Sequence, residues 1–293
     1  MKHTVILFTL TFLSPAIFGQ GSLVWDFLTA GRVYSSPAVD DSAIYIGSND
    51  SCLYALDKQN GKLKWKFRTG GEIKSTPLLF YNSIIFNSTD GLVYSVNKQN
   101  AQEQWIFRTN GEKTLDIWDY YLSSPVYSDN KVFFGSGDGN IYAIEPNSGS
   151  LIWKYKTDGV VHATPLIYNG KVFVGSFDGY FYALNDENGD LIWKFRTVGD
   201  AYFPIGEIQK GAAVYKNSVI FGSRDFNVYS LNIETGRGLW NMKEKGSWVI
   251  AAPLVANDVV YFGTSDSQRF CGLSAETGYE ECSFPLNMRV YGE

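Results

Sequence analysis

Short runs of apolar residues alternate with turn-forming residues along most of the chain. The runs are four to six residues long, are rich in Val, Ile, Tyr and Phe, and are bounded by Gly, Asp, Asn and Ser. Runs of this length and composition are typical of β-strands. The segments "SGDG", "STDG" and "SFDG" indicate hairpin turns, because Asp tolerates the turn conformation and Gly accepts a positive φ. No helical period follows residue 20, so the pattern predicts an all-β fold.

The pattern repeats about every forty residues. Trp25, Trp65, Trp105, Trp153, Trp193 and Trp240 are separated by 40, 40, 48, 40 and 47 residues. Each unit has four apolar runs, which predicts one four-stranded antiparallel sheet per unit. Sheets of this size in tandem are typical of a β-propeller, whose blades bury their faces against one another. We expect six complete blades, at approximately residues 37–67, 77–107, 125–155, 165–195, 212–242 and 253–284.

The two ends of the repeat array leave the number of blades open. Leu23–Leu28 has the pattern of an additional N-terminal outer strand. Arg289-Val290-Tyr291 stands in the same phase as Arg32-Val33-Tyr34, which leads into the first unit. A ring that is closed by an N-terminal strand normally omits that strand at its C-terminal end. We therefore expect either one redundant strand or a truncated form of a parent with seven or eight blades.

The N-terminal segment has the pattern of a secretory signal peptide. Lys2 precedes an apolar core at Val5–Phe12, and small residues follow near Gly19. The apolar core is too short for a membrane-spanning helix. We therefore expect residues 1–19 to be a signal peptide and residues 20–293 to form one exported domain, periplasmic or secreted. The segment ends without a cysteine, so we expect no lipid attachment there.

The repeats resemble a known family. The motifs Ser-Pro, Gly-Ser-x-Asp-Gly, Tyr-Ala-Leu and Trp-Lys-Phe are similar to those of the PQQ-like (pyrroloquinoline-quinone repeat) β-propeller family, from Leu23 to about Pro285. WD repeats fit less well, because the chain has no Gly-His pair. The resemblance implies an interblade docking motif built from an Ala, a Gly and a Trp. On this sequence the motif falls on Ala55, Gly61, Trp65, Trp105, Ala143, Gly149, Trp153, Ala183, Gly189, Trp193 and Trp240.

The sixth unit replaces its aromatic pair by cysteines. Cys271 stands where the other units have Tyr, and Cys282 stands where they have Trp. We expect these positions to face each other across a hairpin, because Tyr54 and Trp65 have the same spacing of eleven residues. Opposed residues lie within disulfide range. The spacing predicts a Cys271–Cys282 disulfide that contributes about 2–3 kcal/mol. The alternative is two buried free thiols.

Two connections between units are longer than the others. They span residues 110–122 and 200–210, both on the face that carries the Asp turns, and the connection between them holds His162. Insertions on one face of a repeat fold commonly form the binding face. We expect a pocket or platform rimmed by Asp116, Trp118, Asp119, Tyr120, Tyr121, His162, Tyr202, Phe203 and Glu207.

A structural interpretation of these residues is equally open. The loop aromatics could cover the top of the sheets, and His162 could be a buried structural residue. The carboxylates that recur once per unit are predicted to form turns, because a residue repeated in every blade indicates architecture and not six catalytic sites. They are Asp50, Asp90, Asp138, Asp178, Asp225 and Asp266.

Composition and motifs narrow the function classes. The formal charge of −5 argues against nucleic acid as a partner. We expect no metal site, because the single His after the signal peptide and the three scattered Cys give no zinc-ligand spacing. A Gly-rich phosphate loop and a Gly-x-Ser-x-Gly nucleophile elbow are also missing from the sequence. The resemblance implies quinone dehydrogenases as one relative class, but no motif here matches their vicinal cysteines or their ligands, so we expect no cofactor.

Three functions are compatible with this composition and these motifs. The favoured one is a non-catalytic scaffold of the cell envelope that binds a protein or an extended polymer such as polysaccharide, as the scaffold propellers of outer-membrane β-barrel assembly do in this family. The alternatives are an oxidoreductase that depends on PQQ or a metal, and a carbohydrate-binding propeller with exposed aromatic platforms. Catalysis stays an open question that the sequence disfavours.

Overall fold

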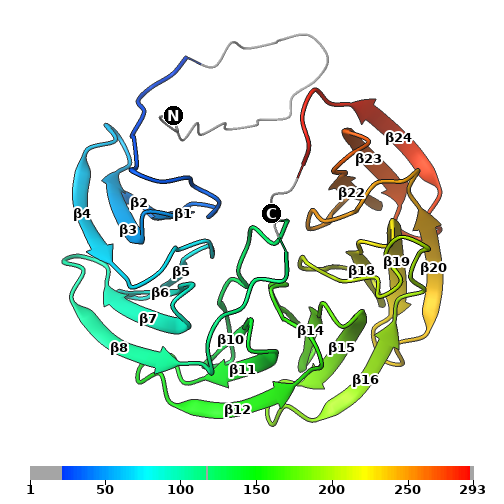
Figure 1. Cartoon of the computed structure of the whole chain (residues 1–293), viewed down its shortest axis with the longest axis horizontal. Helices are drawn as coiled ribbons and strands as arrows, with labels where there is room; N and C mark the ends of the chain where they lie inside the picture. Colours follow the sequence, from blue (N-terminus) through cyan, green and yellow to red (C-terminus); the bar gives the residue numbers. More distant parts are fainter. Residues whose placement is uncertain (1–21, 117, 291–293) are drawn as a thin grey trace.

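Strands account for all the regular structure of the described residues. The computed structural model describes residues 22–116 and 118–290, and the predicted signal peptide lies outside them. Twenty-four strands form six four-stranded antiparallel sheets that stand around a ring (Figure 1). The described residues contain no helix that is long and apolar enough to cross a membrane. The predicted all-β propeller with six complete blades is confirmed.

The sheets follow one another along the chain, and we number them 1 to 6 in this order. Sheet 1 contains β1 (Ala38–Val39), β2 (Ala43–Ser48), β3 (Cys52–Asp57) and β4 (Leu63–Arg68). Sheet 2 contains β5 (Leu78–Phe80), β6 (Ser83–Asn87), β7 (Leu92–Asn97) and β8 (Glu103–Arg108). Sheet 3 contains β9 (Val126–Ser128), β10 (Lys131–Gly135), β11 (Asn140–Ile144) and β12 (Leu151–Lys156).

The second half of the ring repeats this arrangement. Sheet 4 contains β13 (Leu166–Tyr168), β14 (Lys171–Gly175), β15 (Tyr180–Asn185) and β16 (Leu191–Arg196). Sheet 5 contains β17 (Ala213–Tyr215), β18 (Ser218–Gly222), β19 (Asn227–Asn232) and β20 (Gly238–Lys243). Sheet 6 contains β21 (Leu254–Ala256), β22 (Val259–Gly263), β23 (Arg269–Ser274) and β24 (Glu280–Pro285).

A tryptophan on the outer strand joins each of the first five sheets to the next one. Trp153 on β12 lies opposite the small residue Ala143 on β11, which leaves room for the indole. The indole Nε1 donates to the carbonyl oxygen of Asp186 in sheet 4 at 2.9 Å. A Cβ added to Gly189 would lie 2.7 Å from the indole, so only glycine permits this approach, and its φ of +76° also favours glycine. The corresponding donors are Trp65, Trp105, Trp193 and Trp240.

Apolar cores fill the spaces between successive sheets. Five buried clusters join sheet 1 to 2, 2 to 3, 3 to 4, 4 to 5 and 5 to 6. The other face of sheet 1 is covered by Trp25 and Phe27 from the N-terminal segment. Trp25 donates to the carbonyl oxygen of Lys58 at 3.1 Å, as an outer-strand tryptophan does elsewhere, although Leu23–Leu28 forms only an isolated bridge at Leu28. None of the core clusters in the described residues joins sheet 6 to sheet 1.

The recurring aspartates hold turns and links between sheets. Asp90 accepts a bond from the hydroxyl of Tyr94 at 2.7 Å and from the backbone N–H of Leu92 at 3.0 Å. Its carboxylate also accepts the N–H of Gly70 at 2.8 Å, and Gly70 lies in the connection that enters sheet 2. Asp50, Asp138, Asp178 and Asp225 accept the same three kinds of bond, so these carboxylates fix the turn and its link to the preceding connection. Asp266 differs, because it pairs with Arg289.

The strand register corrects the predicted disulfide. Trp65 lies opposite Ala55, one residue away from the predicted Tyr54. In the same register Cys282 lies opposite Gly272, and Cys271 lies opposite Ser283. Successive residues of a strand point to opposite faces, so the two thiols lie on opposite faces of sheet 6. Both are free, and the predicted bond is wrong for this structure.

The thiols provide a direct test of this register. Cys52 and Cys271 are buried, and burial raises the pKa of the Cys271 thiol to about 11, whereas Cys282 is half-buried. We expect one thiol to react with a chromogenic disulfide reagent in the native protein and all three to react in urea. A single reactive thiol in urea would instead demonstrate the disulfide.

The tryptophan contacts predict a large loss of stability on truncation. Trp153→Ala removes an indole that is 7% exposed, together with its bond to sheet 4. We expect the free energy of unfolding to fall by about 3–5 kcal/mol in urea denaturation. The control is Ile152→Ala, a neighbour on β12 that is 42% exposed, for which we expect about 1 kcal/mol or less. Equal losses in both variants would contradict the docking role of the indole.

Candidate functional site

Both long connections lie on the face that carries the Asp turns and the links between sheets, which we call the turn face. Residues 110–122 link β8 to β9, and residues 200–210 link β16 to β17. The link between β8 and β9 extends into the centre of the ring (Figure 1). The two links meet there, because the Gln209 amide donates to the carbonyl oxygen of Trp118 at 3.0 Å.

The first link contains an insertion of eight residues. Without Lys113–Tyr120 its sequence would read Thr-Asn-Gly-Glu-Tyr-Leu-Ser, the length of the Thr69–Ser75 link between sheets 1 and 2. The structure supports this alignment, because the N–H of Asn110 donates to Asp138 at 2.9 Å just as Gly70 donates to Asp90 at 2.8 Å. We call Lys113–Tyr120 the central insertion.

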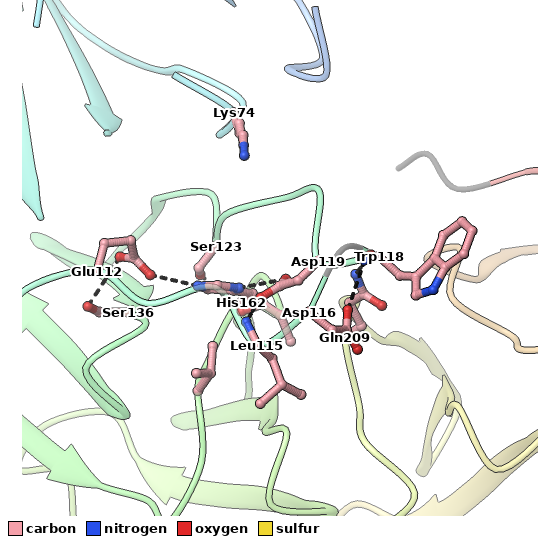
Figure 2. Close-up of polar contacts among 12 residues, drawn as sticks. Lys74, Glu112, Leu115, Asp116, Trp118, Asp119, Ser123, Ser136, His162 and Gln209 are labelled. Atoms are coloured by element: carbon pink, nitrogen blue, oxygen red, sulfur yellow. Dashed lines mark hydrogen bonds and ion pairs between the residues drawn. The ribbon is translucent and has the colours of Figure 1, made fainter. Parts of the chain in front are cut away.

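A buried histidine holds both ends of this insertion. His162 is 1% exposed and lies in the link between sheets 3 and 4. Its Nδ1 lies 2.8 Å from Asp119 Oδ1, and its Nε2 lies 2.6 Å from Glu112 Oε1. Figure 2 shows the two carboxylates on either side of the imidazole ring. A second bond within the loop runs from the N–H of Leu115 to Asp119 Oδ2 at 2.9 Å.

The two carboxylates determine the charge of the ring. Burial alone would lower the pKa of His162, but hydrogen bonds and charge interactions with Asp119 and Glu112 outweigh it and raise the pKa to about 9. At neutral pH the imidazole is therefore protonated and donates from both nitrogens. With neither nitrogen free, His162 positions the loop and has no lone pair to offer a substrate.

A buried arginine holds the middle of the central insertion. The guanidinium of Arg224, which is 2% exposed, donates to Asp116 Oδ2 at 2.6 Å. It also donates to Gln209 Oε1 from Nε and Nη2 at 3.1 and 3.0 Å. Its planar group lies between the rings of Phe177 and Trp248, at 4.9 and 4.8 Å from their centroids. Charge pairing and ring stacking together compensate for its burial.

Aromatic side chains extend the cluster across the ring. Tyr120 stacks on Tyr34 of the link into sheet 1, with ring centroids 5.4 Å apart. Trp118 meets Trp248 edge to face at 6.4 Å. Phe203 of the second link also packs against Trp248, at 5.0 Å. The central insertion therefore contacts the segment that enters sheet 1 and the link that enters sheet 6.

The predicted binding-face residues divide into three groups. Those gathered around the central insertion are Asp116, Trp118, Asp119, Tyr120, Tyr121, His162 and Phe203. Tyr202 is 83% exposed and stands clear of the cluster. Glu207 is half-buried, and its Oε2 atom is buried without a hydrogen-bond partner in the described residues.

Four residues of the site were missed by the sequence analysis: Glu112, Gln209, Arg224 and Trp248. For Arg224 a signal was present. The residue before the recurring turn aspartate is Asn49, Thr89, Gly137, Phe177 or Ser265 in the other units, so Arg224 is the one charged residue at that position. A deviation from the repeat at a turn was therefore as informative as the insertions themselves.

Five charged groups of the site pair with one another. No group of three or more His, Cys, Asp and Glu side chains in the described ranges is arranged to hold a metal ion. Three carboxylates of the first link meet two buried cations, one imidazolium and one guanidinium. The arrangement fixes a loop in one conformation and presents its exposed side chains at a defined place.

Sequence comparison identifies the family. The family model described as outer membrane protein assembly factor BamB matches residues 9–119, 116–244 and 206–281. The chain belongs to this family. No curated protein matches the chain in sequence.

Solved structures share the fold of this family member. BamB from Moraxella catarrhalis has a TM-score of 0.77 at 18% identity, over 92% of this chain and 80% of that chain. A europium-containing methanol dehydrogenase has a TM-score of 0.74 at 14% identity, over 92% and 74% of the two chains. A quinohemoprotein alcohol dehydrogenase from Pseudomonas putida HK5 has a TM-score of 0.69 at 13% identity, over 87% and 59%. At these identities the likeness concerns the fold.

The raised pKa of His162 predicts a pH dependence. The folded value of about 9 exceeds the ordinary value of 6.5, so the stabilisation by the imidazolium is complete below pH 6.5 and is lost as the pH rises through about 9. We expect the melting temperature of the wild type to exceed that of His162→Gln at pH 6, and the difference to disappear above pH 9. An imidazole NMR titration with a pKa at or below 6.5 would contradict this.

Proposed function

We propose that this chain is an exported, non-catalytic scaffold of the cell envelope that binds a protein partner on the turn face. The observation that carries the proposal is a preformed loop platform with exposed apolar side chains. The central insertion is anchored by His162 and Arg224, whereas Leu115 within it is 50% exposed. In the second link Tyr202 and Ile205 are 83% and 44% exposed.

Rigid exposed apolar groups suit the binding of proteins. Apolar side chains gathered on a surface commonly mark an interaction site. A loop that is already ordered loses little entropy when a partner binds, which favours affinity. Exposed tyrosine contributes a large contact area with few rotatable bonds. The match to the BamB family supports an assembly scaffold, and the predicted signal peptide supports export to the envelope. The proposed role uses no cofactor.

Site-specific crosslinking in the producing cells tests this proposal. A photoreactive phenylalanine analogue at Tyr202 should form adducts with a partner protein. The matched control is Tyr81, which is 84% exposed and lies in the turn between β5 and β6 on the opposite face of the ring. We expect adducts at Tyr202 and none of the same mass at Tyr81. Identical adducts at both positions, or none at Tyr202, would overturn the proposal.

A shortened first link separates the platform from the rest of the propeller. Deletion of Lys113–Tyr120 leaves a link of the length found between sheets 1 and 2, so we expect the sheets to fold. The deletion removes Asp116 and Trp118 and with them the anchor to Arg224 and Gln209. We expect the Tyr202 adduct to fall at least tenfold in this variant. An unchanged yield would place the binding surface outside the central insertion.

A further inference from the structure

A cavity lies between sheets 1 and 2, on the face of the ring opposite the turn face. It has a volume of about 420 Å³ and is bounded by the turn between β1 and β2, the first residues of β4 and the turn between β7 and β8. Sites for small molecules commonly have volumes of about 300–1,000 Å³. The cavity is therefore large enough to hold a ligand.

Two other interfaces have an ion pair at the corresponding place. Lys131 at the start of β10 reaches Glu187 of sheet 4, with 2.8 Å between Nζ and Oε1. Lys171 at the start of β14 reaches Glu234 of sheet 5 in the same way, with 2.9 Å between Nζ and Oε2. In both interfaces a long lysine side chain spans the gap between neighbouring sheets.

Sheet 1 departs from this arrangement. The strand registers align Ala43 with Lys131. The residue before Gln99 and the residue before Glu187 both accept the indole N–H of the preceding sheet, so these two side chains are equivalent also. A methyl group stands where the lysine would be, and no side chain from the start of β2 spans the gap toward Gln99. The cavity thus occurs where the chain departs from its repeat.

Trp65 lines the cavity and is more exposed than its counterparts. It is half-buried, whereas Trp105, Trp153 and Trp193 at the equivalent positions are 8%, 7% and 9% exposed. Tyr45 continues this wall, with its ring centroid 5.8 Å from that of Trp65. The electron-rich face of an aromatic ring attracts C–H groups. This wall suits a ligand that has one apolar side.

The charged groups around the cavity balance one another. Asp40 and Asp41 stand with Lys64 and Lys98, and Lys98 Nζ lies 3.1 Å from Asp40 Oδ2. Burial alone would raise the pKa of Asp40, but backbone hydrogen bonds and the bond from Lys98 outweigh it and hold the pKa well below its usual range. The carboxylate is therefore ionised at neutral pH. A charged ligand would meet a like charge here, so the balance favours a neutral one.

Several polar side chains of the wall have hydrogen-bonding capacity to spare. The carboxylate of Asp41 and the amide of Gln99 are exposed and form no hydrogen bond within the described part of the chain. Lys64 uses one of its three N–H groups on the carbonyl oxygen of Ser42, at 3.2 Å. A carboxylate only accepts, an ammonium only donates, and an amide does both. Together they suit hydroxyl groups, which donate and accept at once.

We propose that this cavity binds a neutral oligosaccharide, with one sugar ring against Trp65 and its hydroxyl groups bonded to Asp41 and Gln99. A sugar ring combines an apolar C–H side with hydroxyl groups along its edge, which matches an indole wall beside carboxylate and amide groups. The volume accommodates about one or two such rings. Because the platform lies on the other face of the ring, a sugar and a protein partner can bind at the same time.

Indole NMR signals test this site directly. A chain with isotope-labelled tryptophans is titrated with four neutral disaccharides: maltose, cellobiose, lactose and N,N′-diacetylchitobiose. We expect at least one to shift the Nε1–H signal of Trp65 saturably, with a dissociation constant of about 1 mM or below, and to leave that of Trp153 in place. The absence of a saturable Trp65 shift with all four would overturn the proposal. Tighter binding of inorganic phosphate at Trp65 would also overturn it, because the site would then select an anion.

Two variants separate the cavity from the rest of the surface. Ala43→Lys combined with Gln99→Glu places the ion pair of the other two interfaces across this gap, and we expect the affinity for the disaccharide to fall by about tenfold or more. Asp41→Ala removes an exposed carboxylate and should weaken binding by about tenfold at an unchanged urea midpoint. The matched control is Asp129→Ala in the equivalent turn of sheet 3, which should bind as the wild type does. Wild-type affinity in Asp41→Ala, or an equal loss in Asp129→Ala, would contradict the site.

Discussion

The packing of each outer-strand indole against the next sheet is the contact on which the ring depends. A single four-stranded sheet of this size has two apolar faces and cannot cover either of them. The indole covers the outer part of the gap, and its N–H bond fixes the position of the neighbouring hairpin. The contact recurs five times with little change in its hydrogen bond. Small residues opposite each indole follow from the same constraint.

The residues proposed to bind a partner lie where the chain departs from this repeat. The links of ordinary length connect the sheets and have few side chains available to bind a partner. The central insertion provides additional side chains. His162 and Arg224 hold it in place through charged contacts that the repeat itself does not require.

Much of the architecture could be predicted from the sequence, because six units follow one pattern and each can be compared with the others. The strands, the turn aspartates and the location of both insertions all followed from comparing units. The disulfide failed for a physical reason. Spacing around a hairpin does not determine register when the outer strand contains a bulge, and the bulge just before Cys282 places this residue opposite Gly272.

The candidate site was only partly predictable. The insertion aromatics and His162 were found because they stand outside the repeat. The partners of His162 and Asp116 could not be derived, since Arg224 is 108 residues from Asp116 and nothing local indicates that the two meet. Charge pairing across a ring is set by how loops cross its centre, and the sequence pattern of the strands does not describe that path.

The contact between Asp116 and Arg224, which are 108 residues apart in sequence, also affects how the ring unfolds. A row of sheets that touch only their neighbours behaves as a one-dimensional array, which can lose its end units one at a time. The central insertion ties the link entering sheet 3 to sheet 5 and stacks on the link entering sheet 1. These cross-ring contacts make the loss of one sheet costly to distant ones. The insertion therefore makes an array of repeats unfold more as one cooperative unit.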